Sequence, residues 1–185
     1  MPLLAKIERL KQEAARRVPP AGVSTELFQA FVNASVVHLR APFLSRHSET
    51  ECVDLLASAF ERAFSYQGPT PSVQHRLDGN VLSLWSIMPD QSFVVDTIHL
   101  MLRRKGWEYL AGFNLMVAVG RAEDGSIRSV DGPGDKLESI TWLIAEVPDT
   151  STVESSVSVL TGSLLLCQAL YTDYQPSLDL LNTQA

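Results

Sequence analysis

The stretch that decides the fold covers residues 73–106 and reads VQHRLDGNVLSLWSIMPDQSFVVDTIHLMLRRKG. Its first half contains two short runs that read as strands, at positions 73–76 and 81–87, and the second of them is mostly apolar. The tripeptide Asp78-Gly79-Asn80 separates them, and a turn of this kind between two such runs is a strong hairpin signal. The sequence therefore predicts two short antiparallel strands.

The second half of this stretch changes to the period of a helix. Apolar residues recur three and four positions apart from about residue 92 to residue 105, which predicts a helix over this range. Asp90 stands where a helix-capping side chain is expected, and Gly106 follows where helices commonly end. The buried face of this helix is expected to hold Phe93, Val94, Ile98, Met101 and Leu102.

Further strand-like runs and a long helix follow in the second half of the chain. Residues 113–119, 127–130 and 139–147 have the composition of strands, and residues 152–174 show a long helical pattern. We read the overall order as strand, strand, helix, strand, strand, helix. A single antiparallel sheet with two helices on one face satisfies this order. The predicted fold class is therefore α+β, of the ferredoxin-like or ACT-like type.

A segment with three helical patterns precedes this sheet. The patterns cover residues 2–17, the residues after Ser24, and the residues from Ser48, where Ser48 and Glu51 fit a capping box. A stretch containing Gly and Pro then breaks the helical pattern. The predicted organisation is an all-helical segment (1–66), a connector (67–72) and an ACT-like α+β domain (73–185).

Composition and charge limit the classes to which the chain can belong. Its 185 residues, 45% of them hydrophobic, suffice for one domain with a helical appendage. The net charge of −6 argues against nucleic acid as a partner. Cys52 and Cys167 are expected to be buried thiols in a reducing compartment. Residues 155–172 are uncharged but too rich in Ser, Thr, Gly and Gln to predict a membrane span, so we expect a soluble, cytoplasmic protein without a membrane partner.

The residue types that carry chemistry show no arrangement typical of an active site. The four histidines have no metal-ligand spacing, and Gly132-Pro133-Gly134 lacks the Lys-Ser/Thr of a phosphate-binding loop. No serine stands in a nucleophile elbow. Asp90 and Asp96 lack the third group that a catalytic carboxylate pair would need. The sequence predicts no catalytic residue, no cofactor and no metal.

The start of the helix predicted at residues 92–105 suggests a ligand. Free backbone amides and the positive end of the helix dipole attract a small anion, such as the carboxylate of an amino acid. Asp90, Gln91 and Ser92 surround these amides, and an ordinary helix cap is the competing interpretation. The candidate effector site comprises Asp90, Gln91, Ser92, Asp96 and Asn114.

Residues 82–130 resemble a known family. Leu-Ser-Leu-Trp-Ser-Ile-Met-Pro-Asp-Gln-Ser-Phe-Val-Val-Asp-Thr-Ile, with the later Arg-Lys-Gly and Val-Ala-Val-Gly-Arg-Ala-Glu-Asp-Gly-Ser-Ile, is similar to the N-terminal ACT-like region of the large bacterial NAD-dependent glutamate dehydrogenases. Glu138-Ser139 is similar to the start of the family's next strand. Ser92 stands where the family has a second proline, and Asn114-Leu115 replace its His-Pro. The matching residues are Pro89, Asp90, Phe93, Val95, Asp96, Gly106, Arg121, Asp124 and Gly125.

This resemblance implies a regulatory or architectural role. In the full-length family, which converts glutamate to 2-oxoglutarate, catalysis and nucleotide binding lie far downstream of this region. We therefore expect a non-catalytic ACT-like regulatory or interaction module that senses a small amino-acid-type effector. It is either a stand-alone relative or the leading segment of a longer protein. Two alternatives stay open: a structural or protein-interaction domain without a ligand, and a small enzyme of unknown class.

The last predicted helix suggests a contact with another protein. Val157, Leu160, Leu164 and Leu165 belong to an apolar stripe that is wider than one sheet face requires. We expect these residues to contact a second copy of the chain or the rest of a large dehydrogenase. The alternative is coverage by the N-terminal helices of the same chain. Because the first helix is basic and the C-terminal tail is acidic, these two segments are also candidates to meet.

Overall fold

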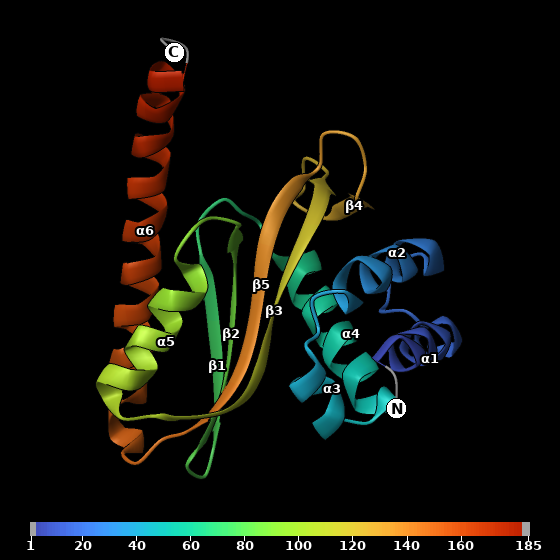
Figure 1. Cartoon of the computed structure of the whole chain (residues 1–185), viewed down its shortest axis with the longest axis horizontal. Coiled ribbons are helices and arrows are strands. Elements are labelled where there is room, and N and C mark those ends of the chain that lie inside the picture. Colours follow the sequence, from blue (N-terminus) through green and yellow to red (C-terminus); the bar gives the residue numbers. More distant parts are fainter. Residues whose placement is uncertain (1–2, 183–185) are drawn as a thin grey trace.

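The computed structural model describes the backbone of residues 3–182 and the side chains of residues 3–172. In this range, five strands form one curled antiparallel sheet that lies between two layers of helices (Figure 1). The order of the strands across the sheet is β1-β2-β5-β3-β4. The strands are β1 (Ser72–Asp78), β2 (Val81–Pro89), β3 (Glu108–Arg121), β4 (Ile127–Val130) and β5 (Lys136–Glu146).

Two helices cover one face of the sheet. α5 (Val94–Lys105) connects β2 to β3, and α6 (Val153–Asn182) follows β5 after the short 3-10 helix η1 (Thr150–Thr152). Because β5 pairs antiparallel with both β2 and β3, these two strands run parallel with β5 between them. The arrangement is consistent with a ferredoxin-like type. The predicted α+β class, with an antiparallel sheet and two helices on one face, is confirmed.

Helices from the N-terminal part of the chain cover the opposite face (Figure 1). They are α1 (Leu3–Arg16), α2 (Thr25–Val36), α3 (Ala41–Arg46) and α4 (Glu49–Ser65). Their apolar sides share one hydrophobic core with this face of the sheet, so the helical segment packs directly on the strands. The core includes Leu10, Phe28, Phe31, Leu56 and Phe60 from the helices, and Trp85, Ile87, Leu115, Ile140 and Trp142 from the sheet.

Alternation along the strands separates this core from a second one beneath α5 and α6. In β2, Leu82 and Leu84 face α5 and α6, whereas Trp85 and Ile87 face the N-terminal helices. Burial on both faces explains why β2 and β5 read as nearly continuous apolar runs in the sequence. The second core includes Leu82, Leu84, Met88, Ile98, Leu102, Leu143, Val157, Leu160 and Leu164.

Several local sequence motifs adopt the structures that are predicted for them. The Ser48 hydroxyl accepts the N–H of Glu51, and the Glu51 carboxylate accepts the N–H of Ser48 at 2.7 Å, which completes the capping box of α4. Gly106 ends α5 in the left-handed conformation, with φ of 66°. Gly79 turns the β1–β2 hairpin with φ of 59°.

The start of α5 differs from the prediction. The N–H of Asp90 donates to the carbonyl of Leu137 at 2.9 Å, which extends the pairing of β2 with β5 by one residue. The helix then begins only at Val94, and its N-cap Phe93 makes no side-chain cap bond. The prediction that Asp90 caps this helix is therefore wrong. Phe93, expected on the buried face, is 70% exposed.

Other boundaries also differ. The sequence reading leaves out α3, a helix of six residues that begins near Pro42 and is too short to show an apolar period. β3 has 14 residues and starts five positions before the predicted 113–119. Its early part contains a register shift near Leu110, which interrupts the alternation on which the prediction depends.

Two basic residues of the first helical segment, Arg9 in α1 and Arg17 just after it, have partners in α4. Arg9 donates to the Glu49 carboxylate at 3.0 Å, and Arg17 pairs with Asp54. In the described part of the chain, α1 and α6 lie on opposite sides of the sheet (Figure 1). The prediction that the first helix contacts the C-terminal segment is therefore wrong for the described part of the chain. The side chains of the acidic residues Asp173 and Asp179 lie outside the described residues.

Candidate functional site: a basic cleft along the edge of β3

The middle of β3 forms an open edge of the sheet. β4 pairs with β3 only near residues 119–121, and the N–H of Asp131 donates to the carbonyl of Ala118 at 2.9 Å. Backbone groups of successive residues in a strand alternate in direction. Because the carbonyl of Ala118 points away from β5, the backbone groups of Gly112, Asn114 and Met116 also point away from it. No strand pairs with these three residues in the described part of the chain.

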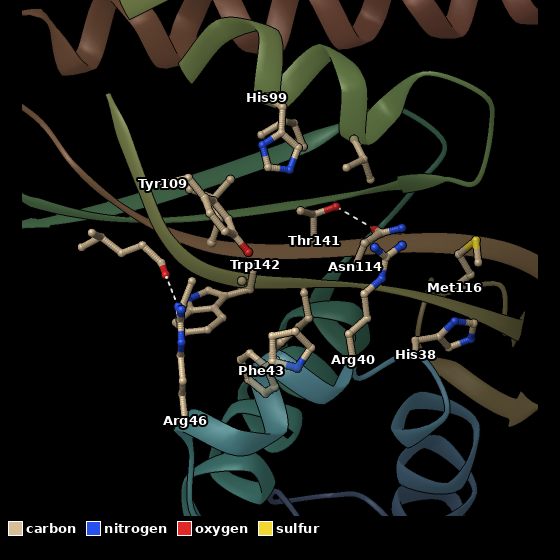
Figure 2. A pocket seen from close by; sticks show the side chains of 18 of the residues that line it. His38, Arg40, Phe43, Arg46, His99, Tyr109, Asn114, Met116, Thr141 and Trp142 are labelled. Carbon is tan, nitrogen blue, oxygen red and sulfur yellow. Dashed lines mark hydrogen bonds between the residues drawn. The ribbon is translucent and has the colours of Figure 1, made fainter. Parts of the chain in front are cut away.

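A cleft of about 610 Å³ follows this edge; we call it the β3 cleft (Figure 2). α5 forms one wall with Val95, Ile98 and His99, and residues of β3 and β5 form the base. The segment that joins α2 to α3 forms the other wall, together with α3 itself. That wall includes Val37, His38, Arg40, Pro42, Phe43 and Arg46.

The charged and titratable side chains that line the β3 cleft include four basic residues, His38, Arg40, Arg46 and His99, and no Asp or Glu. Figure 2 shows Arg40 and Arg46 extending from the α2–α3 wall toward β3, with His99 on the side of α5. One Nη of Arg46 donates to the carbonyl of Leu110 at 3.2 Å. A concave site lined by one sign of charge raises the local concentration of the opposite charge. The β3 cleft is thus suited to anionic groups, although the protein carries a net charge of −6.

Asn114 presents a directed hydrogen-bond donor in this cleft. Its Oδ1 accepts hydrogen bonds from Ser139 Oγ at 2.7 Å and from Thr141 Oγ1 at 2.8 Å. These two hydroxyl donors fix the orientation of the amide, so Nδ2 is the group that stays available to an acceptor outside the network. The arrangement suits a carbonyl or carboxylate oxygen.

Tyr109 and His99 form the end of the cleft next to α5. Their ring centroids lie 5.2 Å apart with an edge-to-face geometry. Burial raises the pKa of the Tyr109 hydroxyl, with Arg46 and Arg40 acting in the opposite direction. The hydroxyl therefore keeps its proton at neutral pH and is available as a donor.

The structure brings only one of the five predicted effector residues, Asn114, into the β3 cleft. Asp90 and Gln91 lie in the connection between β2 and α5, and Ser92 and Asp96 are exposed. Burial raises the pKa of Asp90, while the backbone amide of Gln91 and the nearby His38 lower it. Gln91 Nε2 is buried without a hydrogen-bond partner. Of the predicted effector residues, the four other than Asn114 thus lie outside the lining of the β3 cleft.

The predicted interface residues of α6 separate into two groups. Val157, Leu160 and Leu164 are buried in the second core against the sheet and α5. Leu165 lies on the outer side of the helix and is 41% exposed. The outward apolar surface of α6 consists instead of Val159, Leu165, Leu166, Leu170 and Tyr171.

One part of α6 also meets the simplest criteria for a membrane-spanning helix. Residues 150–172, which comprise η1 and the first part of α6, are long enough and apolar enough, by length and composition alone, to cross a bilayer. A core helix of a soluble protein can pass the same test. In this chain, the side of α6 with Val157, Leu160 and Leu164 is covered by the sheet and α5.

Metal-ligating side chains do not cluster in the part of the chain that the structure describes. No three His, Cys, Asp or Glu side chains within it lie close enough to hold a metal ion. Both cysteines are free, but only Cys52 is buried, so the expectation of two buried thiols is half correct. Burial raises the pKa of Cys52 to about 11. His75 Nε2 lies 3.1 Å from the Glu154 carboxylate at the surface, away from the β3 cleft.

The sequence reading missed the arginines of the β3 cleft, although a signal was present. Residues 27–48 contain Arg40, Arg46 and two histidines but no Asp or Glu. In an acidic protein, such a stretch indicates a local basic surface. The open edge of β3 was not detectable in this way, because it depends on the order of the strands.

No protein-family model matches this chain, and no curated protein is significantly similar to it. The resemblance to the dehydrogenase region therefore rests on the quoted motif residues alone. Several of them have structural roles here. Gly106 ends α5, Arg121 pairs with Glu138, and the Asp124 carboxylate accepts the N–H of Ser126 at 2.9 Å in a turn.

Proposed function

We propose that this protein is a non-catalytic binding module whose β3 cleft receives carboxylate groups of a ligand or partner. The observation that carries the proposal is the set of four basic side chains in a cleft without a lining acid. Arg40 and Arg46 supply charge and planar donors that match a carboxylate, and Asn114 Nδ2 supplies a further donor. The volume of the cleft lies within the range of about 300–1,000 Å³ that is common for ligand sites.

Within this proposal we retain the ACT-like regulatory role that the sequence resemblance implies. The effector would be a small molecule of the amino-acid type, and the binding site would be the β3 cleft instead of the start of α5. The protein would act in the cytoplasm, in contact with a second copy or with the rest of a large NAD-dependent glutamate dehydrogenase. A protein-interaction domain without a small ligand is the alternative that the open edge of β3 favours.

A titration followed by amide chemical shifts tests the proposal. L-glutamate and the capped tripeptide Ac-Glu-Val-Glu-NH2 supply carboxylates in two forms, and L-glutamine serves as the control without a side-chain charge. We expect either carboxylate ligand to shift the resonances of Gly112, Asn114 and Met116. Arg40→Glu should weaken binding about tenfold, whereas Arg76→Glu on the opposite edge strand β1 should leave it unchanged.

Two results would contradict this proposal. The first is a titration in which neither carboxylate ligand shifts the resonances of the β3 cleft. The second is equal affinity of the Arg40→Glu and Arg76→Glu variants. Shifts confined to residues 90–96 would instead support the site at the start of α5.

A further inference from the structure

The unpaired middle of β3 is unusual for the edge of a sheet. Unprotected strand edges pair readily with other chains, and proteins normally protect them with charged side chains, proline or bulges. At β3, both ends of the open stretch are protected, because Arg46 binds the Leu110 carbonyl and β4 begins to pair near Val119. Between these ends, Gly112, Asn114 and Met116 direct their backbone groups outward and none of them is charged.

The opposite edge of the sheet shows the usual protection. β1 carries His75, Arg76 and Asp78 in a strand of seven residues, and Arg76 and Asp78 are exposed. His75 is also engaged with Glu154 of α6. The two edges of the sheet thus differ in their protection against pairing with another strand.

The open stretch of β3 is long enough to pair with a short extended chain. From Gly112 to Met116 there are four residue steps, which correspond to about 14 Å of strand. α5 stands on one side of this edge and the α2–α3 segment on the other, so an added strand would lie between two walls (Figure 2). Apolar groups are present on both walls, with Val95 and Ile98 on α5 and Pro42 and Phe43 opposite.

We propose that an extended acidic segment of a partner protein binds in the β3 cleft as a sixth strand, paired with Gly112, Asn114 and Met116. This inference rests on the carboxylate recognition proposed above and specifies the partner. Main-chain hydrogen bonds to the open edge would supply affinity, and alternate side chains of the guest strand would supply specificity. The basic side chains determine the charge of the guest, since the cleft contains no acid to bind a basic segment.

The walls also define a pattern for the guest sequence. Side chains of an added strand point alternately to the two faces of the sheet. The α2–α3 wall carries Arg40 and Arg46, whereas the α5 wall carries Val95 and Ile98. The expected pattern is therefore an acidic residue at every second position, with apolar residues between them.

Binding of a fluorescein-labelled peptide, Val-Glu-Val-Glu-Val-Glu-Val, tests the inference by fluorescence anisotropy. Met116→Pro removes the outward N–H of residue 116 and leaves the groups that pair with β5 in place, because proline is tolerated on the open side of an edge strand. Met116→Ala removes the same side chain but keeps the N–H. We expect Met116→Pro to weaken binding about tenfold and Met116→Ala to change it less than about threefold.

A pair of modified peptides keeps the test decisive if Met116→Pro does not fold. In one peptide every glutamate is N-methylated, and in the other every valine. A strand that pairs with β3 directs only one of these two sets of N–H groups toward it, so one peptide should bind and the other should not. Equal binding of both peptides would overturn strand addition and leave carboxylate recognition standing. If L-glutamate binds and the unmodified peptide does not, strand addition is overturned in favour of a small effector. If neither L-glutamate nor the unmodified peptide binds, both strand addition and carboxylate recognition are overturned.

Discussion

Arg121 on β3 and Glu138 on β5 form a bidentate ion pair on the side of the sheet that faces the N-terminal helices. Nε donates to Oε1 at 2.7 Å and Nη2 to Oε2 at 2.6 Å, and the two side chains are only 17% and 8% exposed. The other N–H groups of Arg121 donate to the carbonyls of Ala63 at 3.0 Å, Tyr66 at 2.8 Å and Gly125 at 2.5 Å. All donors of the guanidinium are thus used, and the C-terminal end of α4 is joined to the sheet.

Removal of the negative partner should destabilise the fold strongly. Glu138→Gln leaves the Arg121 guanidinium largely buried without its counter-ion, and breaking such a pair costs about 3–5 kcal/mol. Urea unfolding at neutral pH measures the change in the free energy of unfolding. Lys11→Ala, which breaks an exposed pair with Glu8 in α1, is the control and should cost less than about 1 kcal/mol. Similar losses of unfolding free energy in Glu138→Gln and Lys11→Ala would show that the Arg121–Glu138 pair does not stabilise the fold.

The left-handed backbone of Phe93 predicts a substitution that does not weaken the protein. This conformation costs a residue with a side chain about 1–2 kcal/mol, whereas glycine adopts it freely and loses about 0.5–1 kcal/mol of chain entropy. Phe93 is 70% exposed, so little burial is lost. Phe93→Gly should therefore leave stability unchanged or raise it by up to about 1 kcal/mol. Ser92→Gly, at a neighbouring position without positive φ, should lower the stability. A lower unfolding temperature for Phe93→Gly than for Ser92→Gly would contradict the left-handed conformation of Phe93.

The capping box of α4 makes stability depend on pH in the acidic range. Hydrogen bonds from the N–H and hydroxyl of Ser48 lower the pKa of Glu51 below its ordinary 4.5. Because the folded pKa is the lower one, this contribution is complete above about pH 4.5 and is lost as the pH falls through the folded value. Glu51→Gln should flatten the loss of stability between pH 5 and about pH 2. An unchanged pH profile of urea unfolding would contradict the capping role of the carboxylate.

The two cysteines should react with thiol reagents at very different rates. Cys52 is 1% exposed, and burial raises its pKa to about 11, so it is a protonated, inaccessible thiol at neutral pH. Cys167 is half-buried on α6 beside Thr97. With Ellman's reagent we expect one fast thiol in the native protein and a second only after unfolding. Cys167→Ser should abolish the fast phase, and its persistence in this variant would show that Cys52 is accessible.

The predictions that agree with the structure come from signals whose cause is local. The apolar run of β2, the turn at Gly79, the end of α5 at Gly106 and the capping box at Ser48 each depend on neighbouring residues only. The prediction of where α5 begins failed because pairing with a distant strand determines this position. Pairing of Asp90 with Leu137 of β5 keeps the chain extended past the expected cap.

The candidate site was hidden from sequence reasoning for the same reason. Arg40 precedes the short helix α3 and Arg46 ends it, and they line one cleft with Asn114 of β3 and His99 of α5 only because two helical layers pack on the sheet. The predicted interface on α6 failed in part because periodicity shows that a helix has an apolar face, but not which neighbour covers it. Leu160 and Leu164 lie against the sheet, and Leu165 does not.

Site-resolved amide hydrogen exchange along β3 tests the central claim most directly, because it reports both the open edge and its occupation. In the free protein, the amides of Gly112, Asn114 and Met116 should exchange rapidly, while those of Phe113 and Leu115, paired with β5, should be protected. A saturating amount of the Val-Glu-Val-Glu-Val-Glu-Val peptide should slow the first group and leave the second unchanged. Uniform protection of all five amides in the free protein, or unchanged exchange of the first group in the presence of the peptide, would contradict the account.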